Sequence, residues 1–185
     1  ALIISGVVGG ENGMNDIKGF ETFTDISPVE KGWSDDKKYC VVTKEGRRLF
    51  LRIADISEYN RKHAEFNIMK RMAESNVPAC RPVDFGLCNN GKSVYQLLTW
   101  IDGTDADIVL PTLTETKQYI LGLKAGELLH KIHTIPAPDN TDDWAVRYFA
   151  VMDERFEAFH RRNIRFEGDA LVLKFLETNR ALLRN

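Results

Sequence analysis

The sequence predicts an α+β fold in which a small antiparallel sheet carrying one helix is joined by a hinge to a helical lobe. Short β-type runs separated by turn residues occupy the first hundred residues, and one long helical pattern interrupts them. Only helical patterns follow Asp102-Gly103-Thr104. Two strands, a helix and two more strands form an order typical of an antiparallel sheet with one helix. We therefore expect a sheet lobe over 14–101 and a helical portion over 102–185.

The first strands are predicted by β-type runs and their turn residues. Residues 21–29 are expected to contain an edge strand. The runs 39–42 and 48–53 are separated by a polar link that ends in Gly46, which predicts a hairpin. Side chains alternate along a strand, so one face of the second run holds Leu49, Leu51 and Ile53, and the other holds Phe50 and Arg52.

A second hairpin follows the helical pattern. Residues 84–87 lead into Asn89-Asn90-Gly91, and an Asn-Gly pair is a strong signal for a tight hairpin turn. Residues 93–100 then form the returning strand. This pair completes the predicted sheet.

Apolar residues at helical spacing predict the helices. Ser57 is expected to cap a helix that reaches Ser75. Thr112 and Glu115 have the spacing of a capping box in front of a long amphipathic helix that Pro136 and Pro138 end. Two further helices are expected at 141–160 and 169–183, the last with Asp169 as its N-cap.

Composition and charge exclude several classes of protein. The chain has 185 residues, 43% of them hydrophobic and 28% charged, with a formal net charge of −2, as in an ordinary globular protein. Nothing predicts a nucleic acid or an anionic membrane as partner. The three cysteines lack the spacing of a zinc site, which favours reduced thiols in a cytoplasm. No apolar run is long enough to span a membrane.

The first residues have a character of their own. Residues 1–13 are expected to be a leader or a segment derived from cloning, and Met14 is a possible natural start.

Three local patterns could carry chemistry, and each has a plainer alternative. Lys31-Gly32-Trp33-Ser34-Asp35-Asp36-Lys37 lies between two strand signals and could hold a phosphate through backbone N–H groups, although its Gly-Trp-Ser-Asp stretch is equally a polar turn. Arg52 on a strand and Glu65 on the next helix could form a pair that presents a cation to phosphates, or could be unrelated surface residues. Residues 96–103 could dock a flat base at a hinge, or could be a buried strand followed by a turn.

Together and in this order, the patterns resemble the aminoglycoside phosphotransferase family, the protein-kinase-like group that includes choline and homoserine kinases. The resemblance covers roughly residues 27–185 and extends through Leu128-Leu129-His130-Lys131-Ile132-His133. It implies a nucleotide-binding N-lobe, ATP or GTP with Mg²⁺ as cofactor, and transfer of phosphate to a hydroxyl of a small polar acceptor, as in antibiotic-resistance enzymes.

The resemblance also implies roles for single residues. The backbone around Gly32, Ser34 and Asp35 would cover the triphosphate. Arg52 matches the family's phosphate-gripping lysine, and Glu65 its helix partner. The base pocket would be formed by Leu98 and by the backbone from Thr99 to Ile101. An arginine in place of lysine is a departure, because guanidinium is larger and forked.

The family's catalytic loop, His-Gly-Asp with Asn five positions after the Asp, has no match in the chain. Glu167-Gly168-Asp169 is the nearest imitation, but Lys174 stands where the Asn should be. Asp105-Ala106-Asp107 imitates a metal motif yet follows the hinge, and His130 with His133 lacks a third ligand. We expect no catalytic residue and no metal ligand in this chain, and a helical lobe that is incomplete. From these 185 residues alone we expect weak or absent nucleotide affinity and no phosphate transfer.

Several functional hypotheses remain open at this point. The leading one is part of a phosphotransferase acting on an aminoglycoside-like acceptor, with Asp102, Asp105, Asp107 and Glu154 as weak candidates for recognising a cation. The alternatives are a non-catalytic nucleotide-binding or interaction module and an unrelated α+β domain. An incomplete helical lobe is expected to expose apolar residues and to favour self-association, for example through Leu171, Phe175 and Leu182.

Overall fold

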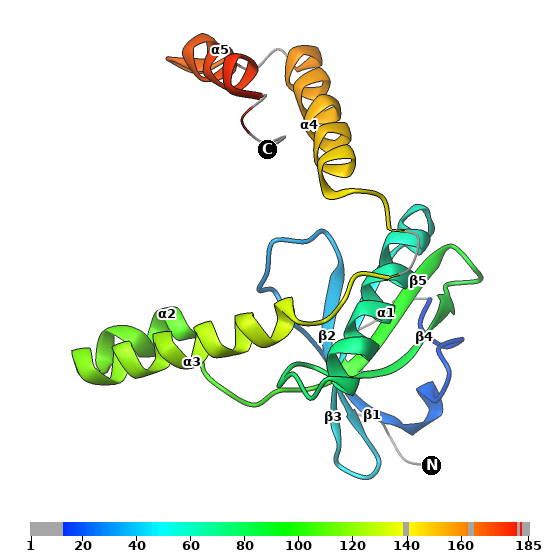
Figure 1. Ribbon diagram of the computed structural model, residues 1–185. Helices are drawn as coiled ribbons and strands as arrows, with labels where there is room; N and C mark the ends of the chain where they lie inside the picture. Colours follow the sequence, from blue (N-terminus) through cyan, green and yellow to red (C-terminus); the bar gives the residue numbers. More distant parts are fainter. Residues whose placement is uncertain (1–12, 139–140, 163–164, 181, 183–185) are drawn as a thin grey trace. The chain divides into compact units, whose positions relative to one another are not determined.

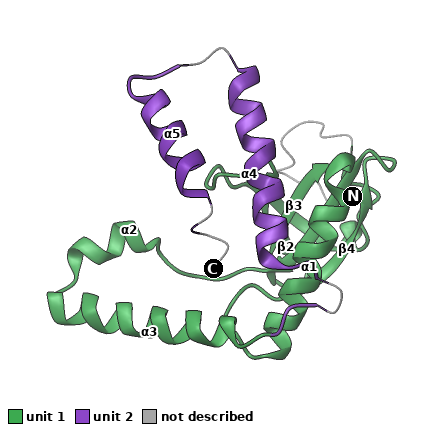
Figure 2. Cartoon of the chain, turned by 45° about the horizontal axis from the view of Figure 1, so that its top comes forward, with its two compact units in different colours: residues 1–135 green, residues 136–185 purple. Residues whose placement is uncertain are grey.

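The computed structural model describes residues 13–138, 141–162, 165–180 and 182 (Figure 1). The chain divides into two compact units, residues 1–135 and residues 136–185, which are considered separately (Figure 2). The leader expected at 1–13 lies, except for Gly13, outside the described residues.

The first unit is built on a five-stranded antiparallel sheet with the order β1-β2-β3-β5-β4. The helix α1 (Tyr59–Glu74) connects β3 to β4. This arrangement confirms the predicted α+β fold with one helix in the sheet lobe. The strands are β1 (Phe23–Pro28), β2 (Lys37–Thr43), β3 (Arg48–Asp55), β4 (Pro82–Cys88) and β5 (Ser93–Thr99).

The two hairpins turn at the predicted residues. Gly46 has a φ of 74°, a conformation that suits glycine, and it lies in the link between β2 and β3. Asn89, Asn90 and Gly91 have φ values of 55°, 53° and 78° between β4 and β5. Asparagine and glycine are the residues that adopt positive φ at least cost, so the local sequence dictates this turn.

One face of the sheet is covered by the segment that precedes β1. Leu49, Leu51 and Ile53 of β3 point to this face, as alternation predicted, and they pack with Met14 and Ile17 in one buried cluster. The carboxylate of Asp16 accepts hydrogen bonds from the N–H groups that begin the β4–β5 turn, those of Asn89 at 2.9 Å and Asn90 at 2.8 Å. Residues 14–22 are thus an integral part of the sheet lobe.

Helix α1 covers part of the other face. Its aromatic and imidazole rings surround Phe85 of β4, with centroid separations of 5.4 Å to Tyr59, 5.2 Å to His63 and 5.3 Å to Phe66. Strand register places Arg52 and Gln96 on the same face as Phe85. The polar residues of β3 therefore lie beside α1.

Two predicted helix caps are wrong. Ser57 donates its hydroxyl to Asp55 Oδ1 at 2.7 Å, and Asp55 caps the 3₁₀ turn η2 (Ile56–Glu58) that precedes α1. Thr112 ends a 3₁₀ turn, in which its hydroxyl donates to the carbonyl of Val109 at 2.7 Å, and Thr114 caps the helix that follows. In both places the predicted cap lies within a 3₁₀ turn that precedes the α-helix, and a different side chain accepts the N–H hydrogen bond of an N-cap.

The remainder of the first unit is helical after the chain leaves β5. It consists of α2 (Ala106–Val109), the 3₁₀ turn η3 (Leu110–Thr112) and α3 (Glu115–His133), which Thr114 caps by accepting from Lys117 N–H. A hydrogen bond of 3.0 Å joins Lys131 Nζ to the carbonyl of Asn76 after α1.

The second unit contains α4 (Trp144–Arg161) and α5 (Asp169–Asn179). Helix α4 begins three residues later than expected because Asp143 caps it, accepting from Ala145 N–H at 2.8 Å. Helix α5 begins at the expected residue, but Gly168, with a φ of 86°, occupies the N-cap in place of Asp169. The expected extension of this helix falls partly on residues 181 and 183, outside the described residues. None of the described helices is long and apolar enough to cross a membrane.

Candidate functional site

Strand alternation gathers polar and apolar side chains on the sheet face that α1 partly covers, here called the site face. Lys38 is opposite Arg52, Cys40 is opposite Phe50, and β5 continues the same rows. The site face therefore comprises Lys38, Cys40, Phe50, Arg52, Gln96 and Leu98.

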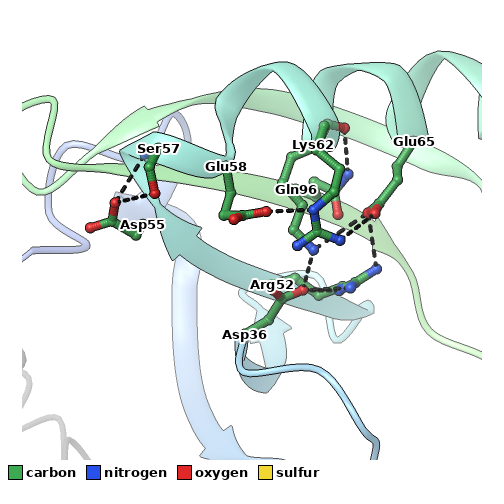
Figure 3. Close-up of polar contacts among 9 residues, drawn as sticks. Asp36, Arg52, Asp55, Ser57, Glu58, Lys62, Glu65 and Gln96 are labelled. Atoms are coloured by element: carbon green, nitrogen blue, oxygen red, sulfur yellow. Dashed lines mark hydrogen bonds and ion pairs between the residues drawn. The ribbon is translucent and has the colours of Figure 1, made fainter. Parts of the chain in front are cut away.

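A single carboxylate oxygen organises the charged part of this face (Figure 3). Asp36 Oδ2 accepts from Arg52 Nε at 2.9 Å, also from Arg52 Nη2, and from Lys62 Nζ at 2.6 Å. Asp36 ends the loop that follows β1, Arg52 lies in β3 and Lys62 lies in α1. The ion pairs consequently fasten the loop to a strand and to the helix at one point.

The three groups differ in burial. The side chains of Lys62 and Asp36 are only 2% and 4% exposed, whereas that of Arg52 is 18% exposed. The Lys62 carbonyl accepts from the side-chain amide of Gln96 at 2.8 Å, which fixes this turn of α1 against β5. Of the two cations, Arg52 is therefore the one that a ligand can still contact.

The charge state of Asp36 follows from its neighbours. Burial alone would raise the pKa of this carboxyl, but the hydrogen bonds and positive charges of Lys62 and Arg52 outweigh burial. The pKa of Asp36 therefore lies below its ordinary value of 3.8, and the group is ionised at neutral pH.

Glu65 is shared among several cations. Its Oε1 accepts from Arg61 Nη1 at 2.9 Å, and its Oε2 lies 3.4 Å from Lys62 Nζ and 4.0 Å from Arg52 Nη1. The structure thus brings Arg52 and Glu65 together, yet the close partner of Arg52 is Asp36. The role of the Arg52–Glu65 pair in binding stays a prediction.

The loop before Asp36 leaves its backbone donors unused. Among the described residues, none accepts a hydrogen bond from the N–H groups of Gly32, Trp33, Ser34 or Asp35. Gly32 has a φ of 107°, which a side chain would disfavour, and Trp33 is fully exposed. A loop of this kind can offer several N–H groups to an anion.

The end of β5 is only partly available for a base. Thr99 donates its N–H to the Arg81 carbonyl at 2.9 Å, and the Trp100 N–H reaches the Arg48 carbonyl at 3.4 Å. The backbone of Ile101 has no hydrogen-bond partner among the described residues, and its side chain is 55% exposed. Leu98 is 2% exposed and can form only the floor of a base pocket.

Phe50 and Trp100 provide aromatic surface near Leu98. Their ring centroids are 6.0 Å apart, with the planes at 73°. Phe50 lies opposite Leu98 in the sheet register and is half-buried, as is Cys40 on its other side. An apolar floor beside the unpaired backbone of Ile101 suits a flat base.

The sequence placed Asp36 in the candidate loop but indicated no role for it, and Lys62 was missed. Lys62 stands one helical turn before Phe66, which shares one apolar face of the helix with Met69 and Ala73. Lys62 therefore lies on the helix face that turns toward the sheet. A lysine on such a face needs a buried anion as partner. This spacing could have identified Lys62 as a buried lysine with an anionic partner.

The acidic and histidine motifs do not assemble into a metal site. Asp105 pairs with Lys31 of the loop, and His130 and His133 lie in the last turn of α3. No group of three or more His, Cys, Asp or Glu side chains suited to a metal occurs among the described residues.

Comparison with known proteins places this geometry in a family. A search of curated proteins found no match. A family model described as the phosphotransferase enzyme family matches residues 25–185, which include the loop, both ion-paired elements and all the helices after the sheet. This match confirms the family to which the sequence pattern pointed. The chain belongs to the phosphotransferase enzyme family, whose fold combines a kinase-like sheet lobe with a helical lobe.

Proposed function

We propose that this chain supplies the nucleotide-gripping part of an ATP- or GTP-dependent phosphotransferase that acts on a hydroxyl of a small polar acceptor. The observation that carries the proposal is the three-way contact of Asp36 with Arg52 and Lys62. It holds a loop with unused N–H groups next to a strand cation, and both features suit a polyphosphate.

The nucleotide has a matching place for each of its parts. The N–H groups of Gly32, Ser34 and Asp35 would bind phosphate oxygens, and Arg52 would approach them from β3. The base would lie over Phe50 and Leu98, with Ile101 as its hydrogen-bonding partner in place of the Thr99 N–H, which the sheet already uses. Glu65 would keep Arg52 oriented. Mg²⁺ would reach the site with the nucleotide phosphates.

We propose that the acceptor is cationic and aminoglycoside-like, because several acidic residues follow β5 and could bind positive charge. Asp102 pairs with Arg48 and Asp105 pairs with Lys31, and all four side chains are largely exposed. Exposed ion pairs contribute little, so a polycationic acceptor could compete for both carboxylates. Asp107 and Glu154 are exposed as well.

We also propose that a polypeptide of residues 1–185 binds nucleotide without transferring phosphate. The contacts of Asp36 with Arg52 and Lys62 are the reason to propose binding where the sequence alone led us to expect weak or absent affinity. None of its residues forms a His-Gly-Asp loop with an Asn five positions after the Asp. A non-catalytic nucleotide-binding or interaction module is the second candidate function. Metal-dependent turnover of ATP or GTP by these 185 residues, measured as acceptor phosphorylation, would contradict both statements.

Cysteine alkylation tests the nucleotide site. Cys40 is half-buried next to Phe50, and burial raises the pKa of its thiol. We expect Mg-ATP or Mg-GTP to slow alkylation of Cys40 several-fold, measured for each cysteine by mass spectrometry. A base seated on Phe50 would shield the thiol.

The same experiment contains its control. Cys88 is fully buried, and burial, together with the charge of Asp16, raises the pKa of its thiol to about 11. It reacts only when the sheet lobe opens, so it reports global stabilisation by the ligand. Equal slowing at Cys40 and Cys88, or none at Cys40, would argue against a base over Phe50.

We further propose that the second unit promotes self-association. Leu171, Phe175 and Leu182 all lie exposed on or after α5. Apolar surface of this kind tends to be covered by another molecule. Light scattering should report a mass above that of the monomer, and the double substitution Leu171→Glu/Phe175→Glu should reduce it. A monomer at every concentration would refute the proposal.

A further inference from the structure

Lys38 is the charged residue of the site face to which neither the family pattern nor the proposed function assigns a role. It lies directly opposite Arg52 in the antiparallel pair of β2 and β3, with both side chains on one face. Like charges placed directly opposite each other on neighbouring strands destabilise a sheet. An adjacent Lys and Arg thus require negative charge nearby.

The described residues supply that negative charge for Arg52 but not for Lys38. Asp36 and Glu65 both lie within ion-pair distance of Arg52. No carboxylate among the described residues lies within 4.0 Å of the Lys38 ammonium. Its partner is the uncharged carbonyl of Ser34, at 2.8 Å.

The position of this ammonium is defined by the loop above it. A Cβ atom on Gly32 would lie 3.4 Å from both Cε and Nζ of Lys38, so the ammonium rests against the backbone of Gly32. The carbonyl of Ser34 uses one of its three N–H donors. Lys38 therefore lies directly beneath the segment whose N–H groups have no partner.

We propose that Lys38 is a second phosphate-binding cation, which contacts the polyphosphate between the Gly32–Asp35 loop and Arg52. This inference rests on the proposed function, since it places the phosphates of the nucleotide at that site. The phosphate oxygens supply the counter-charge that Lys38 lacks among the described residues. The flexible four-carbon side chain allows the ammonium to reach phosphate from its contact with Ser34.

The alternative role for Lys38 is to hold the loop through Ser34. Lys38→Gln separates the two roles, because the amide retains a hydrogen-bond donor and loses the positive charge. Lys37→Gln is the matched control, since Lys37 is the adjacent residue of β2 and its side chain is on the opposite face. Thermal unfolding of each variant verifies that the sheet lobe is folded.

The test measures the affinity of the 185-residue chain for ATP, adenosine and tripolyphosphate by calorimetry. We expect Lys38→Gln to weaken binding of ATP and tripolyphosphate by about tenfold, the range for one charge-assisted hydrogen bond, with adenosine unchanged. Lys37→Gln should bind all three as the wild type does. Lys38→Arg should recover most of the affinity, because the charge is restored.

The outcomes separate this inference from the proposed function. Equal ATP affinity in the wild type and Lys38→Gln would overturn the inference and leave nucleotide binding in place. Tripolyphosphate binding that depends on Lys38, with ATP no tighter than tripolyphosphate, would support the phosphate site and contradict a nucleotide function. If the wild-type chain binds neither ATP nor tripolyphosphate, both the role of Lys38 and the proposed function are wrong.

Discussion

Replacing Lys62 by Met is expected to lower the free energy of unfolding of the sheet lobe by about 3 kcal/mol. The side chain is 2% exposed and contacts Asp36 at 2.6 Å. Its removal leaves the buried carboxylate of Asp36 with only one of its two close cationic partners, Arg52, and removing one partner of a buried ion pair is costly. Helix α1 also loses its link to the base of the loop.

Urea unfolding followed by Trp100 fluorescence measures this effect, because Trp100 packs on Phe50 within the sheet lobe. Trp33 and Trp144 are exposed and can be replaced by Phe in all variants so that they do not interfere. Lys70→Met is the matched control in the same helix. Lys70 is exposed and lies 5.0 Å from the Phe66 ring, a contact worth about 0.5 kcal/mol.

A double substitution distinguishes loss of the ion pair from loss of packing. Asp36→Asn/Lys62→Met removes both charges, and we expect it to be more stable than Lys62→Met alone. If the double variant is as unstable as the sum of the single ones, the contact contributes no coupling and the buried pair is not the cause.

The pH dependence provides an independent check on Asp36. Because its folded-state pKa is lowered, this group contributes stability that is present above its ordinary value of 3.8 and lost as the pH falls through the lowered folded value. When the pH falls below 3.8, the Asp36→Asn variant should therefore lose less free energy of unfolding than the wild type. An unchanged acid dependence would contradict the lowered pKa.

The second large effect is expected for Arg52. Arg52→Gln should weaken binding of ATP by about ten- to a hundredfold, because it removes a positive charge that is 18% exposed beside the loop. Arg52→Lys should lose less, since it keeps the charge but cannot reproduce the two N–H contacts with Asp36.

Arg61→Gln is the control for Arg52. Arg61 is exposed on α1 and pairs with Glu58 and Glu65, so its removal changes the charge near the site without removing a ligand group. Calorimetric titration with ATP should give a wild-type affinity for this variant. Normal ATP binding by Arg52→Gln would mean that the nucleotide uses other cations.

The strands and the two faces of the sheet could be predicted because they depend on local rules. Alternation along β3 separated Leu51 from Arg52, and Asn90-Gly91 specified the turn between β4 and β5. The caps at Ser57 and Thr112 were predicted wrongly because the pattern of residue types does not reveal that a 3₁₀ turn precedes each helix. That turn moves the capping role to Asp55 in the first case and to Thr114 in the second.

The charged centre of the site was only half predictable. Arg52 and Glu65 were selected from their order along the chain, whereas Asp36 appeared to be one more polar loop residue. Its contacts with Arg52 and Lys62 span 16 and 26 residues, and no local pattern specifies pairings of that length. A buried lysine within an apolar stripe shows that an anion must be near without showing which one.

The shared oxygen of Asp36 also constrains how this region can change during evolution. A mutation that removes the carboxylate leaves two neighbouring positive charges, one of them fully enclosed, and a mutation of either cation alters the anchoring of the other two segments. Positions 36, 52 and 62 are therefore expected to be inherited as a unit. Replacements at them should become acceptable in pairs or triplets across related sequences.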